Sequence, residues 1–137
     1  MAVAFVRGAN GHLEANWFDG EQWHWIDQGT PPNTTVASVP SATTYQVSAD
    51  SSGLRVFVFV RGANGHLEVS LWDGTQWQWV DQGTPPNTTV ATAPGATTFA
   101  LNGTQQIFAF VGGADGHLEV NQWDGTQWQW IDQGTPV

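Results

Sequence analysis

The tetrapeptide Gly-His-Leu-Glu occurs three times, at residues 11–14, 65–68 and 116–119, and a second motif follows each copy at a fixed distance. That second motif reads Asp-Gly-x-Gln-Trp-x-Trp-x-Asp-Gln-Gly-Thr-Pro and occupies residues 19–31, 73–85 and 124–136. Aligned on the histidines, the sequence repeats after 54 and then 51 residues, at or just above the period of known repeat architectures. The chain is therefore predicted to be a single repeat domain of residues 1–137, with copies at approximately 1–41, 42–95 and 96–137.

Turn residues divide each copy into short extended segments. In the second copy, segments rich in β-branched and aromatic residues are bounded by Gly, Asn, Asp or Pro, as is typical of strands. We expect strands at Thr43–Ala49, Arg55–Arg61, His66–Trp72 and Trp77–Asp81. No segment combines helical periodicity with helix start and stop signals. Each complete copy is thus predicted to be a four-stranded antiparallel meander in an all-β protein.

The first copy differs from the other two at its beginning. It opens directly at Ala2–Arg7 and lacks the strand that Thr43–Ala49 and Thr97–Asn102 supply elsewhere, which gives eleven expected strands. Four-stranded units of this length are the blades of β-propellers, which usually close as rings of four to eight blades. About three blades cannot close a ring, and open blade faces and sheet edges favour association. We therefore predict an obligate homo-oligomer, with a dimer of six blades as the simplest ring.

A β-trefoil is the alternative fold, because it also contains three four-stranded repeats in about this length. Two features count against it. The copies are longer than usual trefoil repeats, and Gln-Trp-Gln-Trp at 76–79 does not match the Gln-x-Trp signature of trefoil lectins.

The charge balance bears on the possible partners. The chain has 137 residues, three arginines, no lysine, twelve acidic residues and a formal net charge of −9. Such a chain repels phosphate backbones and anionic bilayers, so we expect neither a nucleic acid partner nor membrane insertion. No apolar run reaches the length of a membrane span and no signal peptide precedes the first copy, so we expect a soluble protein whose compartment is unknown. The absence of cysteine removes disulfides and thiolate metal sites.

Two segments of the second copy resemble the blades of bacterial β-propeller lectins, including the fucose-binding group. They are Val-Phe-Val-Arg-Gly-Ala-Asn-Gly-His-Leu-Glu at 58–68 and Leu-Trp-Asp-Gly-Thr-Gln-Trp-Gln-Trp at 71–79. The resemblance extends over all three copies. It implies a ring of blades with sugars held in pockets between neighbouring blades, lined by aromatic, acidic and basic side chains. It does not specify the sugar.

The repeated residues have the chemistry of such a pocket. A sugar ring has a face of C–H bonds edged by hydroxyls, which suits an aromatic plate beside charged donors and acceptors. Nine tryptophans exceed what a core of this size needs. The candidate carbohydrate-binding residues are Arg7 and Arg61 as donors, Glu14, Glu68 and Glu119 as acceptors, Trp25, Trp79 and Trp130 as plates, and His12, His66 and His117 as further hydrogen-bonding partners. Gly112 replaces the arginine in the third copy, which predicts one weaker site per chain.

Ordinary structural roles remain open for the same residues. The tryptophans can pack blade against blade, the histidines can bond the turn backbone, and Asp19, Asp73 and Asp124 precede glycine as turn residues do. A structural or protein-interaction propeller is therefore the alternative function, and an engineered propeller fragment is a third interpretation.

Catalysis, cofactors and metals are not expected. Three equivalent copies of one residue set multiply binding, whereas a catalytic site is an asymmetric constellation, and no nucleophile elbow, phosphate loop or zinc-helix motif is present. The four histidines are spread along the chain and no calcium-loop pattern occurs, so no metal is predicted.

Overall fold

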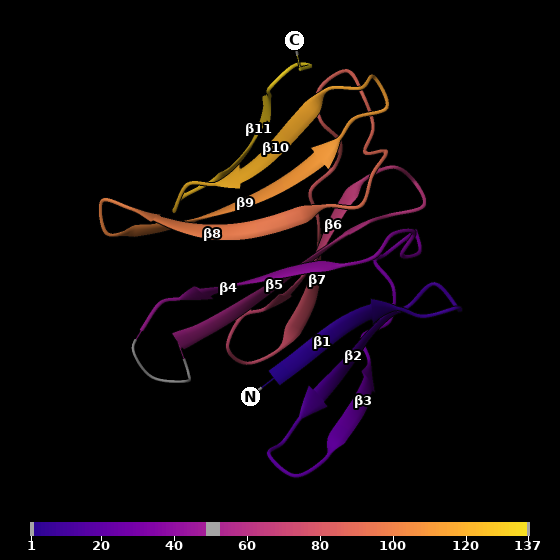
Figure 1. Ribbon diagram of the computed structural model, residues 1–137, viewed down its shortest axis with the longest axis vertical. Helices are drawn as coiled ribbons and strands as arrows, with labels where there is room; N and C mark the ends of the chain where they lie inside the picture. The colour runs from indigo at the N-terminus through magenta and orange to yellow at the C-terminus, as the bar shows by residue number, and fades with distance from the viewer. Residues whose placement is uncertain (1, 49–52, 137) are drawn as a thin grey trace.

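A computed structural model describes residues 2–48 and 53–136 of the chain. Within these residues eleven strands form three separate antiparallel sheets (Figure 1). The first sheet contains β1 (Ala2–Arg7), β2 (Leu13–Phe18) and β3 (Trp23–Asp27). The second contains β4 (Ser41–Gln46), β5 (Leu54–Arg61), β6 (Leu67–Trp72) and β7 (Trp77–Asp81). The third contains β8 (Gly95–Leu101), β9 (Thr104–Gly112), β10 (Leu118–Trp123) and β11 (Trp128–Asp132).

Each sheet is a meander in which strands adjacent in sequence are hydrogen-bonded neighbours. These sheets are propeller blades, called blades 1, 2 and 3 in chain order, so the prediction of an all-β protein with about three blades is confirmed. The β-trefoil alternative is wrong, because each sheet is a separate meander and not part of one barrel. The end of the first strand of copy two, predicted at Ala49, lies outside the described residues. No helix in residues 2–48 and 53–136 meets the length and hydrophobicity that a membrane span requires.

The Asp-Gly turns join the last two strands of each blade. Asp73 Oδ1 accepts hydrogen bonds from the backbone N–H groups of Thr75 and Gln76, both at 2.9 Å. Gly74 has a φ of 103°, a conformation that costs glycine little. The sequence Asp-Gly thus reverses the chain so that Trp72 and Trp77 become cross-strand partners.

The segment after each blade ties it to the next. Val36 N–H donates to the carbonyl of Gly11 in blade 1 at 2.9 Å, and Ala37 N–H donates to the carbonyl of Arg61 in blade 2 at 2.8 Å. Val36 itself is buried in one core cluster with Leu13 of blade 1 and Val58 of blade 2. The second linker repeats this pattern with Val90 as the buried residue. The main core therefore lies in the two junctions between blades.

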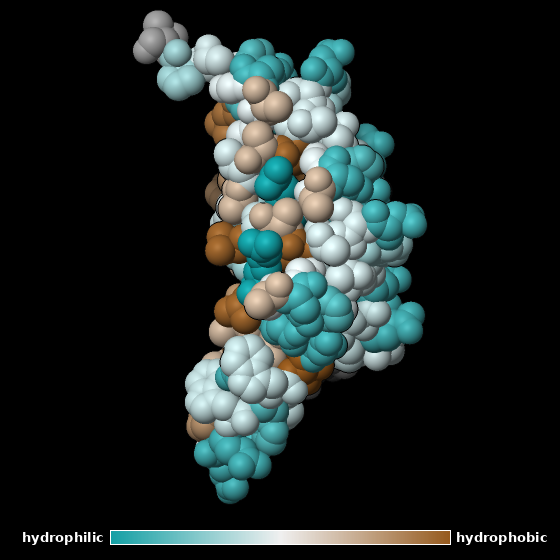
Figure 2. All heavy atoms as spheres, turned by 90° about the vertical axis from the view of Figure 1, so that its right-hand side faces the viewer, coloured by the Kyte–Doolittle hydropathy of each residue, from teal (hydrophilic) through white to brown (hydrophobic). Residues whose placement is uncertain are grey.

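The two outer faces of the array are uncovered. On blade 1, Trp23 is 56% exposed and Trp25 is 66% exposed. On blade 3, Phe110 and Leu118 are 38% and 45% exposed, although the equivalent residues of blade 2, which has a neighbour on that side, are fully buried. Figure 2 shows hydrophobic residues gathered along one side of the molecule and hydrophilic residues along the other.

Blade 1 contains no counterpart of β4 or β8 among the described residues. In blades 2 and 3 these strands lie side by side (Figure 1). Thr43 Oγ1 and Thr98 Oγ1 are 2.7 Å apart, and Ser41 Oγ accepts a hydrogen bond from Ala96 N–H at 3.0 Å. The strand β1 is consequently an open sheet edge, whereas β5 and β9 are paired on both sides.

Candidate functional site

Strand register separates the arginine of each copy from the glutamate of the same copy. Arg61 lies opposite Leu67, and Glu68 lies opposite Val60, in the β5–β6 ladder. Because successive side chains point to opposite faces of a sheet, Arg61 and Glu68 face different junctions. Arg61 Nε donates to the carbonyl of Val90 at 3.0 Å, on the side of blade 3. A junction therefore combines the arginine of one blade with the glutamate of the next.

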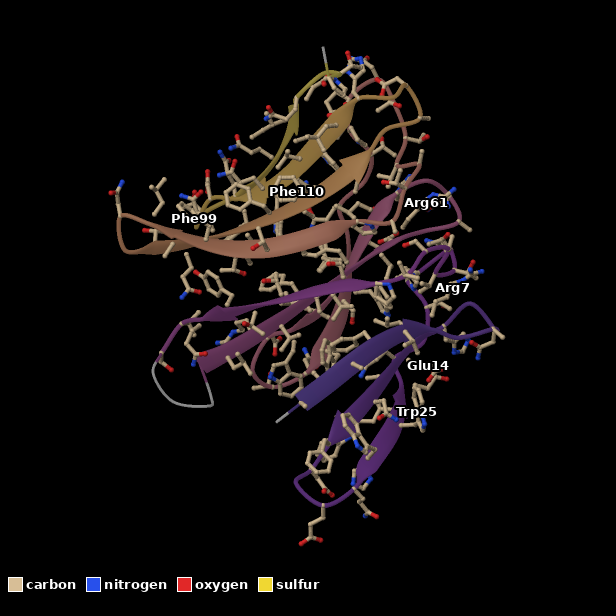
Figure 3. The ribbon with its side chains drawn as sticks, viewed as in Figure 1. Arg7, Glu14, Trp25, Arg61, Phe99 and Phe110 are labelled. Atoms are coloured by element: carbon tan, nitrogen blue, oxygen red, sulfur yellow. The ribbon has the colours of Figure 1, made fainter. Side chains whose placement is uncertain are left out.

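This arrangement pairs Arg7 with Glu68 at the first junction and Arg61 with Glu119 at the second. Gly112, the third member of the arginine series, faces outward beyond blade 3, and Glu14 faces outward from blade 1. Figure 3 shows Arg7, Arg61 and Glu14 along the same side of the molecule. Among the described residues, neither Arg7 nor Arg61 has a carboxylate oxygen within 4.0 Å.

A cluster of one histidine and two carboxylates occurs in blade 2 on its face toward blade 1. His66 Nδ1 lies 3.0 Å from both carboxylate oxygens of Asp81. Glu68 has no exposed surface, and neither of its carboxylate oxygens has a hydrogen-bond partner within residues 2–48 and 53–136. Burial, and then the charge of Asp81, raise the pKa of Glu68 to about 7.

The same cluster recurs in the other blades. In blade 3, His117 Nδ1 lies 2.9 Å from Asp132, and burial raises the pKa of the unexposed Glu119. In blade 1, His12 Nδ1 lies 2.9 Å from Asp27. Glu14 of that blade is half-buried, because no blade covers this face. These three sets are called the His–Asp–Glu clusters below.

The predicted tryptophan plates lie at the seams between blades. Trp79 is half-buried, and its indole N–H donates to the carbonyl of Gln28 in the preceding blade at 3.2 Å. Trp130 repeats this bond with the carbonyl of Gln82 at 3.1 Å. Trp25 has no preceding blade and stands exposed (Figure 3).

Open pockets lie at the opposite end of the blades, beside the Asp-Gly turns. The pocket of the second junction has a volume of about 230 Å³. It is lined by Tyr45, Val47, Arg55, Phe57, Leu71 and Asp73 of blade 2 and by Trp123 and Trp128 of blade 3. The two tryptophan ring centres are 5.7 Å apart, and Phe57 meets Trp128 edge-on at 6.2 Å.

The charged residues of this pocket come from one blade and the tryptophans from the other. Hydrogen bonds from the backbone N–H groups of Gln76 and Thr75 lower the pKa of Asp73, and the positive charge of Arg55 lowers it further. Asp73 is therefore ionised at neutral pH. The pocket offers two aromatic faces, a guanidinium and a carboxylate in one concavity.

The pocket of the first junction has a similar volume, about 240 Å³, but a different lining. Its walls are Val3, Phe5, Ala15, Trp17, Ile26 and Gln28 of blade 1 and Leu54, Val56, Trp72 and Trp77 of blade 2. None of the described residues that line it is charged. Val3 occupies the position that Phe57 holds in the second junction.

Sequence reasoning did not select Arg55, Trp123 or Trp128 as site residues, and it treated Asp73 as a turn residue. Asp73 has both roles in the structure, because its Oδ1 accepts a hydrogen bond from the turn backbone and the residue also lines the pocket. A signal for Arg55 was present, because it is one of only three cationic residues in the chain and its counterpart in the third copy is Gln106. The contact across blades could not be read from the repeat.

Comparison with known proteins places the fold. No family model matches the sequence, and no curated protein is significantly similar to it. Among solved structures, the chain is similar to a fucose lectin from Kordia zhangzhouensis in complex with methyl-fucoside, with 23% identity over 98% of this chain and 90% of that chain and a TM-score of 0.74.

Two further solved structures share the fold. One is a triple arginine-to-alanine mutant of AofleA from Arthrobotrys oligospora, with 16% identity over 98% of this chain and 38% of that chain and a TM-score of 0.70. The other is SapL1 lectin in complex with alpha methyl fucoside, with 16% identity over 97% of this chain and 43% of that chain and a TM-score of 0.64. The chain thus spans less than half of these two proteins and most of the Kordia protein.

Proposed function

We propose that the protein is a carbohydrate-binding lectin without catalytic activity, which holds fucose or a related monosaccharide in pockets between its blades. The observation that carries this proposal is the second-junction pocket, where two tryptophans of one blade face Arg55 and Asp73 of the next. Two of the solved structures with the same fold are described as complexes with a methyl fucoside, which favours this sugar class.

The pocket matches the surface of a pyranose ring. Its C–H face packs against an aromatic plate, and its hydroxyls need donors and acceptors at the edge of that plate. The planar guanidinium of Arg55 can bridge two neighbouring hydroxyls, and the ionised Asp73 accepts from a third. Tyr45 adds a further aromatic edge.

The other predicted residues take supporting positions in this proposal. Arg7 and Arg61 lie at the other end of the two junctions from the pockets, and the half-buried Trp79 and Trp130 lie between the two ends. Glu68 and Glu119 are fully buried at that end of the junctions and do not line the pocket. The half-buried Glu14 and the exposed Trp25 are covered when another blade packs on blade 1.

We also propose that chains associate head to tail into a closed ring, with two chains and six blades as the simplest case. The uncovered faces support this. Phe99 and Phe110 of blade 3 (Figure 3) are exposed on the face that in blade 2 packs against the next blade. Leu118 is exposed on the same face. Blade 1 exposes Trp23 and Trp25, whose equivalents pack in the inner junctions.

Such a ring places a further pocket between chains. By equivalence with the second junction, blade 3 contributes Phe99 and Gln106, and blade 1 of the next chain contributes Phe18 and Trp23. Glutamine replaces the arginine there, so this pocket binds more weakly. Several pockets on a rigid ring raise the apparent affinity for clustered glycans by about 10² to 10⁴.

Calorimetric titration with methyl α-fucoside tests the sugar proposal. The variant Arg55→Gln gives the second junction the residue of its counterpart and should weaken binding at least tenfold, whereas Gln106→Ala should preserve binding at that junction. Circular dichroism verifies the fold of both variants. If the wild type binds no fucoside at millimolar concentration, the lectin proposal is wrong and the structural-propeller interpretation is favoured. If Arg55→Gln binds as the wild type does, the sugar site is not in this pocket.

Native mass spectrometry tests the ring. The variant Phe110→Asp places a charge on the uncovered face of blade 3 and should yield single chains. Val39→Asp, at a linker residue that is 67% exposed, is the matched control and should leave the assembly intact. A wild-type protein that is monomeric at micromolar concentration contradicts this part of the proposal.

A further inference from the structure

Two of the His–Asp–Glu clusters, those of blades 2 and 3, each contain a fully buried glutamate carboxylate. In blade 2, the ligand-type atoms of His66, Glu68 and Asp81 all lie within 4.8 Å of one another. Glu68 is fully buried, and both of its oxygens lack a hydrogen-bond partner among the described residues. Glu119 in blade 3 repeats this state. Two carboxylates are thus aimed into equivalent clusters with nothing bonded to them.

An unpartnered buried carboxylate is costly. Removing an ionised carboxylate from water without a compensating partner is strongly unfavourable, so buried charges are paired or coordinate a metal ion. Asp81, beside Glu68, adds a second negative group, and the chain carries a net charge of −9. The arginine on this junction, Arg7, lies beyond ion-pair distance of Glu68. A cation within the cluster would compensate both carboxylates.

The donor set indicates which cation. One imidazole nitrogen with two carboxylates suits zinc and related transition ions, while calcium and magnesium prefer oxygen ligands alone. Ligands about 2.0–2.2 Å from a tetrahedral ion lie roughly 3–4 Å from one another. The separations within 4.8 Å therefore require only a small contraction around an ion.

We propose that the His–Asp–Glu clusters are binding sites for a divalent transition-metal ion, with Zn²⁺ as the best match. His66, Glu68 and Asp81 form one covered site. Asp115, His117 and Glu119 form the second, in which Asp132 is bonded to His117 Nδ1. His12, Glu14 and Asp27 form a third, which is covered when another blade packs on blade 1. All ligands of a site come from one blade, and the preceding blade closes over it.

The third copy has an additional carboxylate. Asp115 stands where the first two copies have Asn10 and Asn64. Its Oδ2 lies 3.8 Å from His117 Nδ1, and it belongs to the same set of neighbouring ligand atoms as Glu119. The blade 3 site therefore binds the ion more tightly than the blade 2 site.

The metal sites are independent of the proposed sugar pocket. Asp81 and His66 lie at one end of the β6–β7 hairpin, and Asp73 and Trp77 lie at the other end. Sequence analysis predicted no metal because the histidines are dispersed. Hairpin pairing brings each histidine to an aspartate 15 residues further along the chain, a contact that ligand-spacing motifs do not describe.

Calorimetric titration of ZnCl₂ into the chelator-treated full chain tests the proposal. The expected result is two tight sites per chain in the single chain and a third where the chains form the closed ring, with Ca²⁺ bound at least a hundredfold more weakly. The double variant Asp81→Asn and Asp132→Asn should weaken Zn²⁺ binding at least tenfold. Both aspartates are half-exposed, and asparagine keeps the oxygen that accepts from Gly83 N–H and Gly134 N–H, so the fold is retained.

The matched control is Asp19→Asn. Asp19 Oδ2 lies 2.6 Å from His24 Nε2, yet no buried carboxylate accompanies this pair. The control should bind Zn²⁺ as the wild type does. Equal losses in the control and the double variant would show unspecific histidine binding and overturn the proposal, as would Zn²⁺ bound no more tightly than Ca²⁺.

A second measurement uses Glu68→Gln with Glu119→Gln. Zn²⁺ should raise the thermal unfolding midpoint of the wild type, and this shift should vanish in the double glutamine variant. An undiminished shift in the variant would exclude the buried carboxylates as ligands.

Discussion

The two blade junctions are built from equivalent faces and yet differ in how they close. At the second junction, Phe57 packs edge-on against Trp128 and β4 packs beside β8. At the first, Val3 replaces Phe57 and no inner strand lies beside β4 among the described residues. Both junctions keep a pocket of similar volume, but charged residues line only the second of the two. Near-identical repeats therefore form pockets with different linings, because each blade has different neighbouring residues.

A second contrast concerns the residue that ends the second strand of each copy. Arg61 N–H donates to Ser38 Oγ at 2.9 Å, whereas Gly112 N–H donates to Thr92 Oγ1 at 2.8 Å. A Cβ atom on Gly112 would lie 2.8 Å from Thr92 Cγ2. The glycine thus accommodates the extra methyl group of threonine. The exchange of arginine for glycine is a packing compensation, and it affects the outer face of blade 3.

The largest expected effect is the loss of stability when an aromatic side chain is truncated at each junction. Phe59 is unexposed and meets Trp128 at 6.1 Å, while its equivalent Phe5 is half-buried and meets Trp77 at 5.9 Å. Phe59→Ala should lower the free energy of unfolding by about 3–5 kcal/mol. Phe5→Ala should lower the free energy of unfolding by about 1–2 kcal/mol, because the folded chain buries less of the Phe5 side chain than of Phe59. Urea unfolding followed by tryptophan fluorescence measures both, and equal losses would contradict the difference between the junctions.

The next effect is a pH dependence that originates at the first junction. Because burial raises the pKa of Glu68 from 4.5 to about 7, the folded state binds more protons than the unfolded state within this range. The free energy of unfolding should therefore fall as the pH rises from 4.5 to 7, by about 1–3 kcal/mol for this group. The aspartates with lowered pKa values lose their stabilising effect at lower pH.

Denaturant unfolding between pH 4 and 8, with chelator present, measures this slope. Glu119, whose pKa is also raised, contributes in the same direction. Glu68→Gln should flatten the curve in part, and Glu68→Gln with Glu119→Gln should flatten it further. A stability that increases from pH 4.5 to 7 in the wild type would be incompatible with these buried carboxyls.

A smaller effect tests the exchange at Gly112. Gly112→Arg should destabilise the chain by about 1–3 kcal/mol, because its Cβ crowds Thr92. Adding Thr92→Ser removes the methyl group and should recover most of that loss. Thermal unfolding of the single and double variants gives the coupling, and additive effects would refute the compensation.

The smallest expected effect is the gain in stability from filling the pocket of the first junction. Val3→Phe introduces the residue that the second junction has at this position and should raise the free energy of unfolding by about 0.5–1 kcal/mol. Val6, on the opposite face of β1 and 41% exposed, provides the control Val6→Phe, for which no gain is expected in the single chain. The same chemical denaturation assay compares the two variants.

Much of the fold followed from short-range patterns. The strand Trp77–Asp81 was predicted with its observed bounds, and Arg55–Arg61 differs from β5 by one residue. Turn residues and alternation are local properties, so they are visible in one copy of the repeat. Alternation along β6 likewise puts Glu68, Ser70 and Trp72 on one face.

The candidate site was less predictable, because its parts come from different blades. The sequence grouped arginines and glutamates in one candidate residue set, but the hairpin register puts Arg61 and Glu68 of the same copy on opposite faces. Arg55 was overlooked because its pocket partners Trp123 and Trp128 lie more than a whole repeat away in the chain. Contacts of this kind depend on how sheets stack, which no local pattern specifies.

The sequence by itself determined three copies of a β-meander, a strongly acidic chain and a supply of aromatic residues larger than its core needs. The tertiary structure decided which of those residues meet. Glu68 and Glu14 occupy the same position in identical tetrapeptides, yet one is fully buried and the other half-buried, since only one has a blade packed over it. Burial, and with it the pKa and ligand chemistry of a side chain, is a property of the neighbours that folding brings, and those neighbours are distant in sequence.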